Sequence, residues 1–307
     1  MVSIANLSPT TYLPLEAERG HLFLIPWILQ WRSRHLWIRL SELSRATLIL
    51  ENRKQALISC LQFSTVKVIR VDMRLSEADL LLWAKACAAT QKQLFLRIPP
   101  SIRMPHQHQR FWWGVKRLCD WIAALVLLIG LGPLMLITMA MMWVWMPGPF
   151  FFKQWRVGQR GKLFEIVKFR TMIPNADQLH HQVMGQQQGL HKRKDDPRIT
   201  PLGRWLRKFS LDELPQLWNV LKGDMSLVGP RPWALYDAVR LPPEGYSRLN
   251  ALPGITGPWQ VQGRSSVLDL GAVTRLDLDY LHHWSILKDL KILFLTVPKV
   301  LSGIAAH

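Results

Sequence analysis

The chain has 307 residues, of which 49% are hydrophobic. It is therefore long enough for one large domain or two smaller ones with cores of their own, which excludes a peptide-sized scaffold or a disordered chain. Lysine and arginine (39) outnumber aspartate and glutamate (21), and the net charge of +18 predicts an anionic partner: a nucleic acid, an anionic membrane surface or a phosphorylated substrate. The three cysteines form no CxxC pair, which excludes a disulfide framework or a cysteine-based zinc site and favours a reducing compartment.

The N-terminal third is expected to hold a small α/β domain at residues 43–103, preceded by a basic, tryptophan-containing segment at residues 1–42. Ser76 is followed by two acidic residues, and a serine N-cap with acids in the first turn predicts a helix that runs to about Thr90. Short runs of strand-forming residues predict strands at 46–50, 66–71 and 93–98. We find no cluster of catalytic residue types here, so docking, regulation or oligomerisation is the expected role.

Residues 104–150 are expected to form a linker and a membrane helix, because residues 121–152 contain no charged side chain. At about 1.5 Å per residue, such a run can reach across a hydrocarbon core of roughly 30 Å. Pro133 follows a Gly-Leu-Gly sequence in its middle, where a proline removes a backbone donor and breaks a helix. Basic residues flank both ends, which places both ends on the cytoplasmic side. We therefore favour a re-entrant hairpin over a spanning helix, although proline also occurs in spanning helices.

Residues 151–307 are expected to carry the chemistry, and their densest stretch contains the adjacent carboxylates of Asp212 and Glu213. Two interpretations of this pair are open. Ser210 and Glu213 match the S-x-x-E capping box, which predicts an ordinary helix start. Pro215, however, follows too early for a regular helix, so the carboxylates are expected at a backbone irregularity. Adjacent acids repel one another, and keeping both ionised requires a cation, either Mg²⁺ or arginine.

Basic side chains are close to this pair in the sequence, and one of them is held by prolines. Arg231 lies between Pro230 and Pro232 on a stiff, extended backbone, which suits bidentate recognition of phosphate. A carboxylate, a metal and rigid arginines make a phosphoryl-transfer constellation with the carboxylate as nucleophile. From the residues alone, helix capping and surface ion pairs remain the competing interpretation. The other basic residues near the pair are Arg198, Arg204, Arg207 and Lys208.

Two further functions are carried as alternatives. The D-x-D sequence Asp277-Leu278-Asp279 could hold a divalent metal, which would make the protein a metal-dependent membrane glycosyltransferase that releases UDP. The basic composition alone would also fit a non-catalytic membrane-surface scaffold or a nucleic-acid-binding protein. No aromatic-interleaved RNA motif or helix-turn-helix pattern supports the last of these, so no nucleic acid is expected as a partner.

Several long motifs, in order, resemble the bacterial sugar transferases, and more specifically the monotopic phosphoglycosyl transferases, also called undecaprenyl-phosphate sugar phosphotransferases. The resemblance covers about residues 111–302. The motifs are KRLCDW at 116–121, PGPFFFKQWRVGQRGKLFEIVKFRTM at 147–172, RITPLGRWLRKFSLDELPQLWNVLKGDMSLVGPRP at 198–232, PGITGPWQVQGR at 253–264 and WSILKDLKIL at 284–293.

The resemblance implies a reaction and a set of site residues. Members of this family transfer a sugar 1-phosphate from a UDP-sugar to polyprenyl phosphate, release UMP, and pass through an aspartyl phosphosugar intermediate with Mg²⁺. By motif, Asp212 corresponds to the nucleophile and Glu213 to its metal-binding partner. Asp277 aligns with a later acidic position, and Pro133 with the helix-breaking proline of the membrane hairpin. The positions that match phosphate-contacting basic residues are Arg207, Arg231 and Lys168.

The implied fold class is α+β, mostly helical and monotopic, with a Pro-broken re-entrant helix hairpin and the small N-terminal α/β domain. The layout resembles the shorter cyanobacterial members linked to heterocyst envelope polysaccharide, some with a STAS-like N-terminal region. The expected location is the cytoplasmic face of the bacterial inner membrane. The partners implied are the UDP-sugar, polyprenyl phosphate, the membrane, and either a second copy of the chain or other proteins of glycan assembly, in exopolysaccharide or surface-glycan synthesis.

Overall fold

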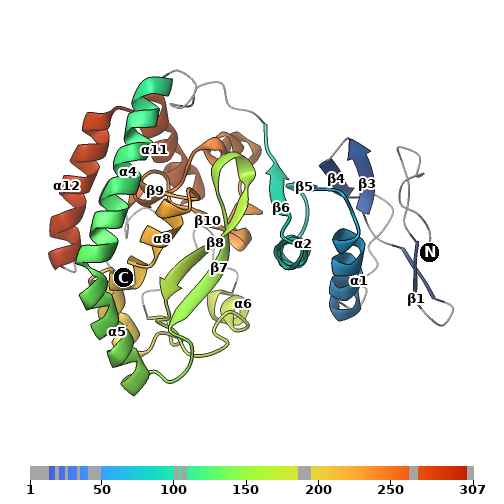
Figure 1. Ribbon diagram of the computed structural model, residues 1–307, viewed down its shortest axis with the longest axis horizontal. Helices are drawn as coiled ribbons and strands as arrows, with labels where there is room; N and C mark the ends of the chain where they lie inside the picture. Colours follow the sequence, from blue (N-terminus) through green and yellow to red (C-terminus); the bar gives the residue numbers. More distant parts are fainter. Residues whose placement is uncertain are drawn as a thin grey trace.

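The computed structural model describes residues 14–17, 21–24, 27–32, 35–40, 50–99, 104, 109–185, 195–262 and 269–302. Helices predominate over strands in an α+β architecture that consists of a small N-terminal unit and a larger body (Figure 1). The α+β class predicted from the sequence is therefore confirmed.

The N-terminal unit is built on a four-stranded sheet with the strand order β3-β4-β5-β6. Strands β3 and β4 are antiparallel, whereas β4, β5 and β6 are parallel, with one helix in each crossover. Strands β1 and β2 form a separate antiparallel pair. The elements of this unit are β1 (Pro14–Ala17), β2 (His21–Leu24), β3 (Trp27–Arg32), β4 (His35–Leu40), α1 (Leu50–Gln62), β5 (Val68–Asp72), α2 (Glu77–Ala89) and β6 (Gln93–Arg97).

The predicted elements of this unit are partly confirmed. Strands β5 and β6 match the strands expected at 66–71 and 93–98, and the Ser76 hydroxyl caps α2 by accepting a hydrogen bond from the Asp79 amide at 3.1 Å. Of the strand expected at 46–50, residues 46–49 lie outside the described residues, and Leu50 instead begins helix α1.

The sheet also takes two strands from residues 27–40, which the sequence analysis placed in the basic segment before the domain. Leu36 and Ile38 of β4 are buried, while His35 and Trp37, which alternate with them, are only partly covered. This two-residue alternation is the pattern of a strand, but bulky tryptophan and basic residues on the other face obscure it in the sequence. The α/β unit therefore begins earlier than residue 43.

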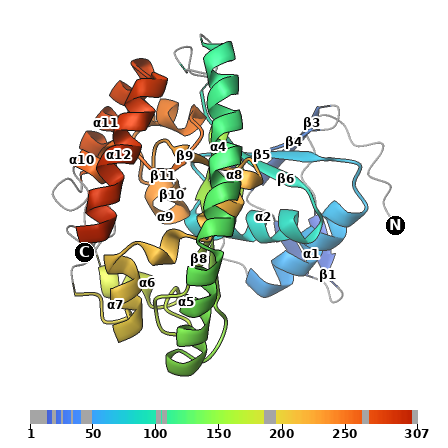
Figure 2. The same cartoon turned by 60° about the vertical axis from the view of Figure 1, so that its left-hand side comes forward.

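Two consecutive helices form the long apolar segment: α4 (Arg110–Gly130) and α5 (Gly132–Trp145). They are bent by 54° at Leu131, and Pro133 lies in the first turn of α5 (Figure 2). Proline is tolerated in the first turn of a helix, but it has no backbone N–H to donate to a carbonyl of the preceding turn. The break between α4 and α5 therefore falls where the sequence predicts it. In the described part of the chain, no unbroken helix is long and apolar enough to cross a membrane, and only this bent pair meets that test jointly.

The body consists of helices packed around two short sheets. Strand β7 pairs antiparallel with both β8 and β10, and β9 pairs parallel with β11. Its strands are β7 (Phe151–Val157), β8 (Leu163–Phe169), β9 (Ser226–Val228), β10 (Trp233–Ala234) and β11 (Gly254–Thr256). Its helices and 3₁₀ turns are η2 (Gln159–Gly161), α6 (His180–Met184), α7 (Pro201–Lys208), η3 (Leu211–Glu213), α8 (Gln216–Leu221), α9 (Leu235–Ala238), η4 (Pro243–Asn250), α10 (Pro258–Gln262), α11 (Leu270–His282) and α12 (Ile286–Ser302).

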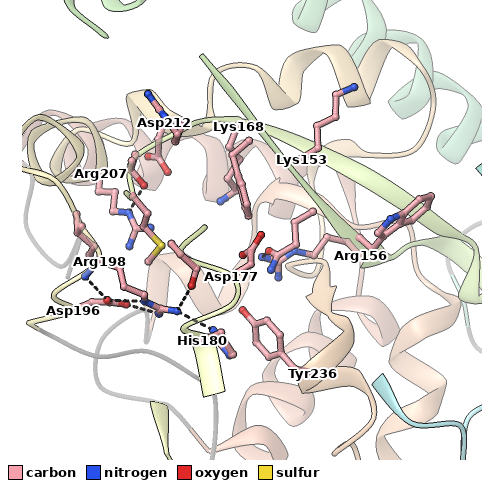
Figure 3. Close-up of a pocket in the computed structure, with 18 of the residues that line it drawn as sticks. Lys153, Arg156, Lys168, Asp177, His180, Asp196, Arg198, Arg207, Asp212 and Tyr236 are labelled. Atoms are coloured by element: carbon pink, nitrogen blue, oxygen red, sulfur yellow. Dashed lines mark hydrogen bonds and ion pairs between the residues drawn. The ribbon is translucent and has the colours of Figure 1, made fainter. Parts of the chain in front are cut away.

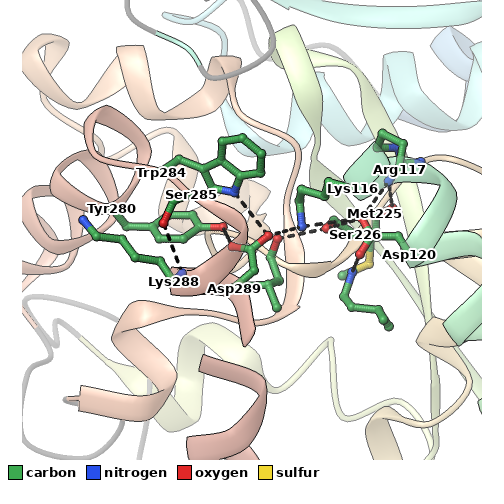
Figure 4. A network of polar contacts seen from close by, with 12 residues as sticks. Lys116, Arg117, Asp120, Met225, Ser226, Tyr280, Trp284, Ser285, Lys288 and Asp289 are labelled. Carbon is green, nitrogen blue, oxygen red and sulfur yellow. Dashed lines mark hydrogen bonds and ion pairs between the residues drawn. The ribbon is translucent and has the colours of Figure 1, made fainter. Parts of the chain in front are cut away.

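A buried polar network ties α4 to the C-terminal helices (Figure 4). The Lys116 ammonium lies 2.7 Å from Asp289 and 3.6 Å from Asp120, and all three side chains are buried. Asp289 also accepts hydrogen bonds from the Tyr280 hydroxyl at 2.6 Å and the Trp284 indole at 3.1 Å. The charges are thus compensated inside the protein, which fixes the position of α4 on the body.

We expect Asp289→Ala to lower the free energy of unfolding by about 3–5 kcal/mol, because it leaves the Lys116 ammonium buried with a single, longer ion pair. Asp279→Ala is the matched control, since that carboxylate is exposed and its His283 contact lies on the surface. Chemical denaturation of the detergent-solubilised full chain measures both. Equal denaturation midpoints for the two variants would show that the network does not hold α4.

Candidate functional site

A cavity of about 1600 Å³ opens between the β7–β8 hairpin, α6, α7, η3 and α9. Charged side chains of both signs converge on it from these elements (Figure 3). All five residues that the sequence predicts for substrate or metal binding and catalysis line this one cavity: Lys168, Arg207, Asp212, Glu213 and Arg231. Pro133 lies apart from it, in the bend of the α4–α5 pair.

The two carboxylates are presented by the 3₁₀ turn η3, which begins at a strained residue. Ser210 has φ 53°, in the left-handed region that a non-glycine residue adopts only at a cost. Its side chain makes no capping hydrogen bond, so the capping-box interpretation of Ser210 and Glu213 is wrong. The Glu213 amide instead bonds the Ser210 carbonyl at 3.1 Å, and α8 starts only after Pro215. The irregularity predicted from Pro215 is therefore real.

Glu213 is held between two cations. Its Oε1 atom lies 2.7 Å from the Lys168 ammonium of β8 and 3.3 Å from the Arg231 guanidinium. Burial lowers the pKa of Lys168, and the charge of Glu213 opposes that shift. Asp212, the neighbouring carboxylate, is also buried, with 7% of its surface exposed. Two adjacent, largely buried acids thus lie on a cavity wall that carries positively charged side chains.

Arg207 reaches the same wall from the last turn of α7. Its Nε atom donates to the Thr171 hydroxyl at 2.8 Å. Burial lowers the pKa of Arg207, and among the negative charges that oppose this shift, that of Asp212 is the strongest. The helix can approach Thr171 because Gly203 has no side chain: a Cβ there would lie 2.0 Å from the Thr171 carbonyl oxygen. Sequence reasoning missed Gly203, although a glycine inside a helix often signals such a close approach.

Arg231 is positioned from behind by a second buried ion pair. Arg248 donates to the Arg231 carbonyl at 2.8 Å and pairs with Asp277 at 2.6 Å. Asp277 is fully buried, and burial raises its pKa while Arg248 opposes the rise. Asp279, two residues later on α11, is exposed and faces the solvent. The D-x-D carboxylates therefore face away from one another, as residues two apart on a helix must, and cannot share a metal ion.

The cavity is also lined by polar groups that the sequence analysis did not identify as site residues, although it named Arg198 among the basic residues near the carboxylate pair. The rings of His180 and Tyr236 stack with centroids 4.1 Å apart, and Arg198 holds Asp196 in a bidentate pair with contacts of 2.9 and 2.6 Å (Figure 3). Burial raises the pKa of Asp177, which lies between these groups and Arg156 in the same view. The elements that carry these residues meet only in the folded chain, so no sequence spacing identifies them.

The carboxylates suit a hard cation such as Mg²⁺. That ion is usually bound by one or two carboxylates together with substrate phosphates and water, and it prefers oxygen ligands. Asp212 and Glu213 provide such a pair on the cavity wall. Among the described residues, no cluster of three or more His, Cys, Asp or Glu side chains forms a complete metal cage. The residues present therefore fit a metal shared with a bound phosphate.

Comparison with known proteins finds a family model and several relatives that match more than half of the chain. A family model described as bacterial sugar transferase matches residues 111–303. The galactosyl transferase CpsE of Streptococcus agalactiae is 45% identical over 165 residues, which are 52% of this chain and 36% of CpsE. The exopolysaccharide production protein ExoY of Sinorhizobium fredii is 40% identical over 199 residues, 60% of this chain and 84% of ExoY. The undecaprenyl-phosphate galactose phosphotransferase of Salmonella typhimurium is 41% identical over 205 residues, 63% of this chain and 42% of that protein. The chain thus spans less than half the length of the first and third of these relatives.

We expect Gly203→Ala to destabilise the fold by about 1–3 kcal/mol and to loosen α7, because the new methyl group overlaps the Thr171 carbonyl. Gly114→Ala in α4 is the matched control: a Cβ at that position would meet no atom within 4 Å, so better helix propensity should stabilise the helix slightly. Hydrogen–deuterium exchange followed by mass spectrometry measures the local effect. Unchanged exchange across α7 in Gly203→Ala would contradict this account of how Arg207 is placed.

Proposed function

The chain belongs to the bacterial sugar transferase family, and we propose that it transfers a sugar 1-phosphate from a UDP-sugar to undecaprenyl (polyprenyl) phosphate, releasing UMP. The observation that carries this proposal is the placement of Asp212 on a strained turn, in a cavity wall that also holds the cations Lys168, Arg207 and Arg231. The names of relatives support the substrate class: the Salmonella typhimurium relative is an undecaprenyl-phosphate galactose phosphotransferase and the Caulobacter vibrioides one a UDP-glucose:undecaprenyl-phosphate glucose-1-phosphate transferase.

In the first step of this mechanism, an Asp212 carboxylate oxygen attacks the β-phosphorus of the UDP-sugar. The bond from that phosphorus to the bridging oxygen breaks, UMP leaves with the bridging oxygen, and the sugar phosphate stays on Asp212. In the second step, a phosphate oxygen of the lipid attacks the same phosphorus and frees Asp212. No net proton is needed, because an anion enters and an anion leaves in each step. The site accordingly needs fixed positive charge more than an acid or a base.

The basic side chains have distinct tasks in this scheme. Arg231, held on its two prolines and from behind by Arg248, is suited to bidentate binding of a phosphate. Arg207, fixed by Thr171, stabilises charge that develops next to Asp212. Lys168 pairs with Glu213 and holds that carboxylate in place. Glu213, next to the nucleophile Asp212, would hold Mg²⁺ when it is bound, and the metal would supply further neutralisation of the diphosphate.

The lipid acceptor requires a site at membrane height, and the surface of the protein supports one. Helices α4, α5 and α12 expose large apolar side chains to the outside of the molecule, among them Trp121, Trp143 and Phe294. Exposed apolar area of this kind marks a membrane or protein interface, and tryptophan favours the headgroup layer. We infer that the α4–α5 pair enters the cytoplasmic leaflet of the bacterial inner membrane, turns at Pro133 and returns. The cavity would then face the lipid phosphate from the cytoplasmic side.

The nucleotide product tests the reaction. Membranes containing the protein are given Mg²⁺, polyprenyl phosphate and a panel of UDP-sugars, and we expect UMP release that falls at least about 10³-fold in Asp212→Asn, which lacks the nucleophile. Asp279→Asn is the control and should keep full activity. Release of UDP, or loss of activity in Asp279→Asn but not in Asp212→Asn, would overturn this mechanism.

Thiol labelling tests the re-entrant topology. In a chain whose native cysteines are replaced, Gln109→Cys and Lys222→Cys place one exposed thiol before and one after the α4–α5 pair. We expect a membrane-impermeant maleimide to label both in inside-out vesicles and neither in right-side-out vesicles, because a re-entrant pair returns to the side it left. Labelling of the two positions from opposite sides would show a spanning helix.

A further inference from the structure

Helix α2 of the N-terminal unit forms part of the wall of the cavity, although it lies outside the segment matched by the family model. The residues of α2 that line the cavity are Glu77, Ala78, Leu81 and Lys85, and the last three share one face of the helix. Figure 1 shows α2 below β6, on the side of the N-terminal unit that is turned toward the body. The cavity is therefore completed by a unit that the sequence analysis left without any site residues.

The contact between the two units is extensive and specific. One continuous apolar cluster joins Leu80 and Trp83 of α2 with Trp233 and Leu235 of the body. Phe95 of β6 forms a backbone bridge with Lys162, and the Asn250 amide donates to the Pro99 carbonyl at 2.9 Å. Such a buried interface fixes α2 against the body, so the position of its cavity-facing side chains is built into the fold.

Lys85 lines the cavity and is exposed, and Figure 3 shows Asp177, His180 and Tyr236 on the side of the cavity away from Asp212. The charge of Lys85 acts on Asp177, together with those of Arg198 and Arg156. At the other end, Lys168 and Arg231 both pair with Glu213 of η3. The cavity thus has a reactive end at η3 and a second end bordered by α2, Asp177 and the stacked His180 and Tyr236 rings.

We propose that this second end binds the nucleoside monophosphate part of the donor and that Lys85 of α2 contacts it, so the N-terminal unit completes the donor site. This proposal rests on the proposed function. The transferred sugar is bonded to the phosphorus that Asp212 attacks, so the sugar must lie at the reactive end. The nucleoside is one phosphate further away, which places it toward α2.

The groups at the second end match that ligand. The His180 and Tyr236 rings provide an aromatic surface beside which a pyrimidine base can pack. The Lys85 ammonium is a donor for the α-phosphate or for a carbonyl oxygen of the base, and it is exposed to the cavity. With a volume of about 1600 Å³, the cavity exceeds the roughly 300–1,000 Å³ of a typical small-molecule site and has room for the donor and the lipid phosphate.

Binding of UMP to the detergent-solubilised full chain, measured by isothermal titration calorimetry, tests the proposal without turnover. We expect Lys85→Ala to weaken UMP binding about tenfold or more, the loss of one charge-assisted hydrogen bond, and Lys85→Arg to restore most of it. Ala78→Trp should weaken UMP binding as well, because its indole fills the second end. Lys54→Ala is the matched control, an exposed lysine on α1 away from the cavity.

Two further measurements separate this proposal from a general loss of structure and from the proposed function. KM for the UDP-sugar should rise in Lys85→Ala while KM for polyprenyl phosphate stays the same. UMP affinities of Lys85→Ala and Ala78→Trp equal to that of Lys54→Ala, or no UMP binding by the unaltered chain, would overturn the role of α2. Lys85-dependent UMP binding by a chain that releases no UMP from any UDP-sugar would instead overturn the proposed function and leave the nucleotide site standing.

Discussion

The arrangement of the site depends on the placing of the Glu213 carboxylate between Lys168 and Arg231. The contact joins three segments that are distant in sequence: strand β8, the turn η3 and the Pro-Arg-Pro segment. A buried carboxylate is strongly disfavoured without such partners, and so are the two cations without the carboxylate. Each segment is therefore held in place by the other two. This constraint also sets the position of Asp212, because the adjacent Glu213 fixes the turn that carries both residues.

The body repeats this principle of compensated charge behind the site. Arg248 and Asp277 form a buried pair that supports the backbone of Arg231, and Lys116 with Asp289 fixes helix α4. None of these four side chains lines the cavity, yet each pair sets the position of an element that the proposed reaction requires. Buried ion pairs contribute little net stability compared with apolar residues, but they tolerate only one geometry. A reaction between two anions needs such rigidity, because its barrier is lowered mainly by cations that are already in position.

Local signals in the sequence were sufficient for some elements and misleading for others. The Ser76 cap, strands β5 and β6 and the break near Pro133 could be predicted, since each depends on a few neighbouring residues. Ser210 matched a capping box but adopts a left-handed backbone, and the Glu213 side chain forms ion pairs with Lys168 and Arg231, which are distant in sequence. The inward direction of Asp277 depends on Arg248, 29 residues away. The contribution of α2 to the cavity arises from a contact between two units that no spacing encodes.

A donor site shared between two units has a thermodynamic consequence. A ligand that contacts both units binds only their docked arrangement, so it must stabilise docking by the same free energy that docking contributes to its affinity. The reactive end needs the same phosphate chemistry whichever donor is used, and all of its residues belong to the body. The second end includes α2, where Ala78 and Lys85 are exposed to the cavity and bear little on the core of their own unit. Changes in these side chains can therefore alter donor recognition without disturbing Asp212, Glu213 and their cations.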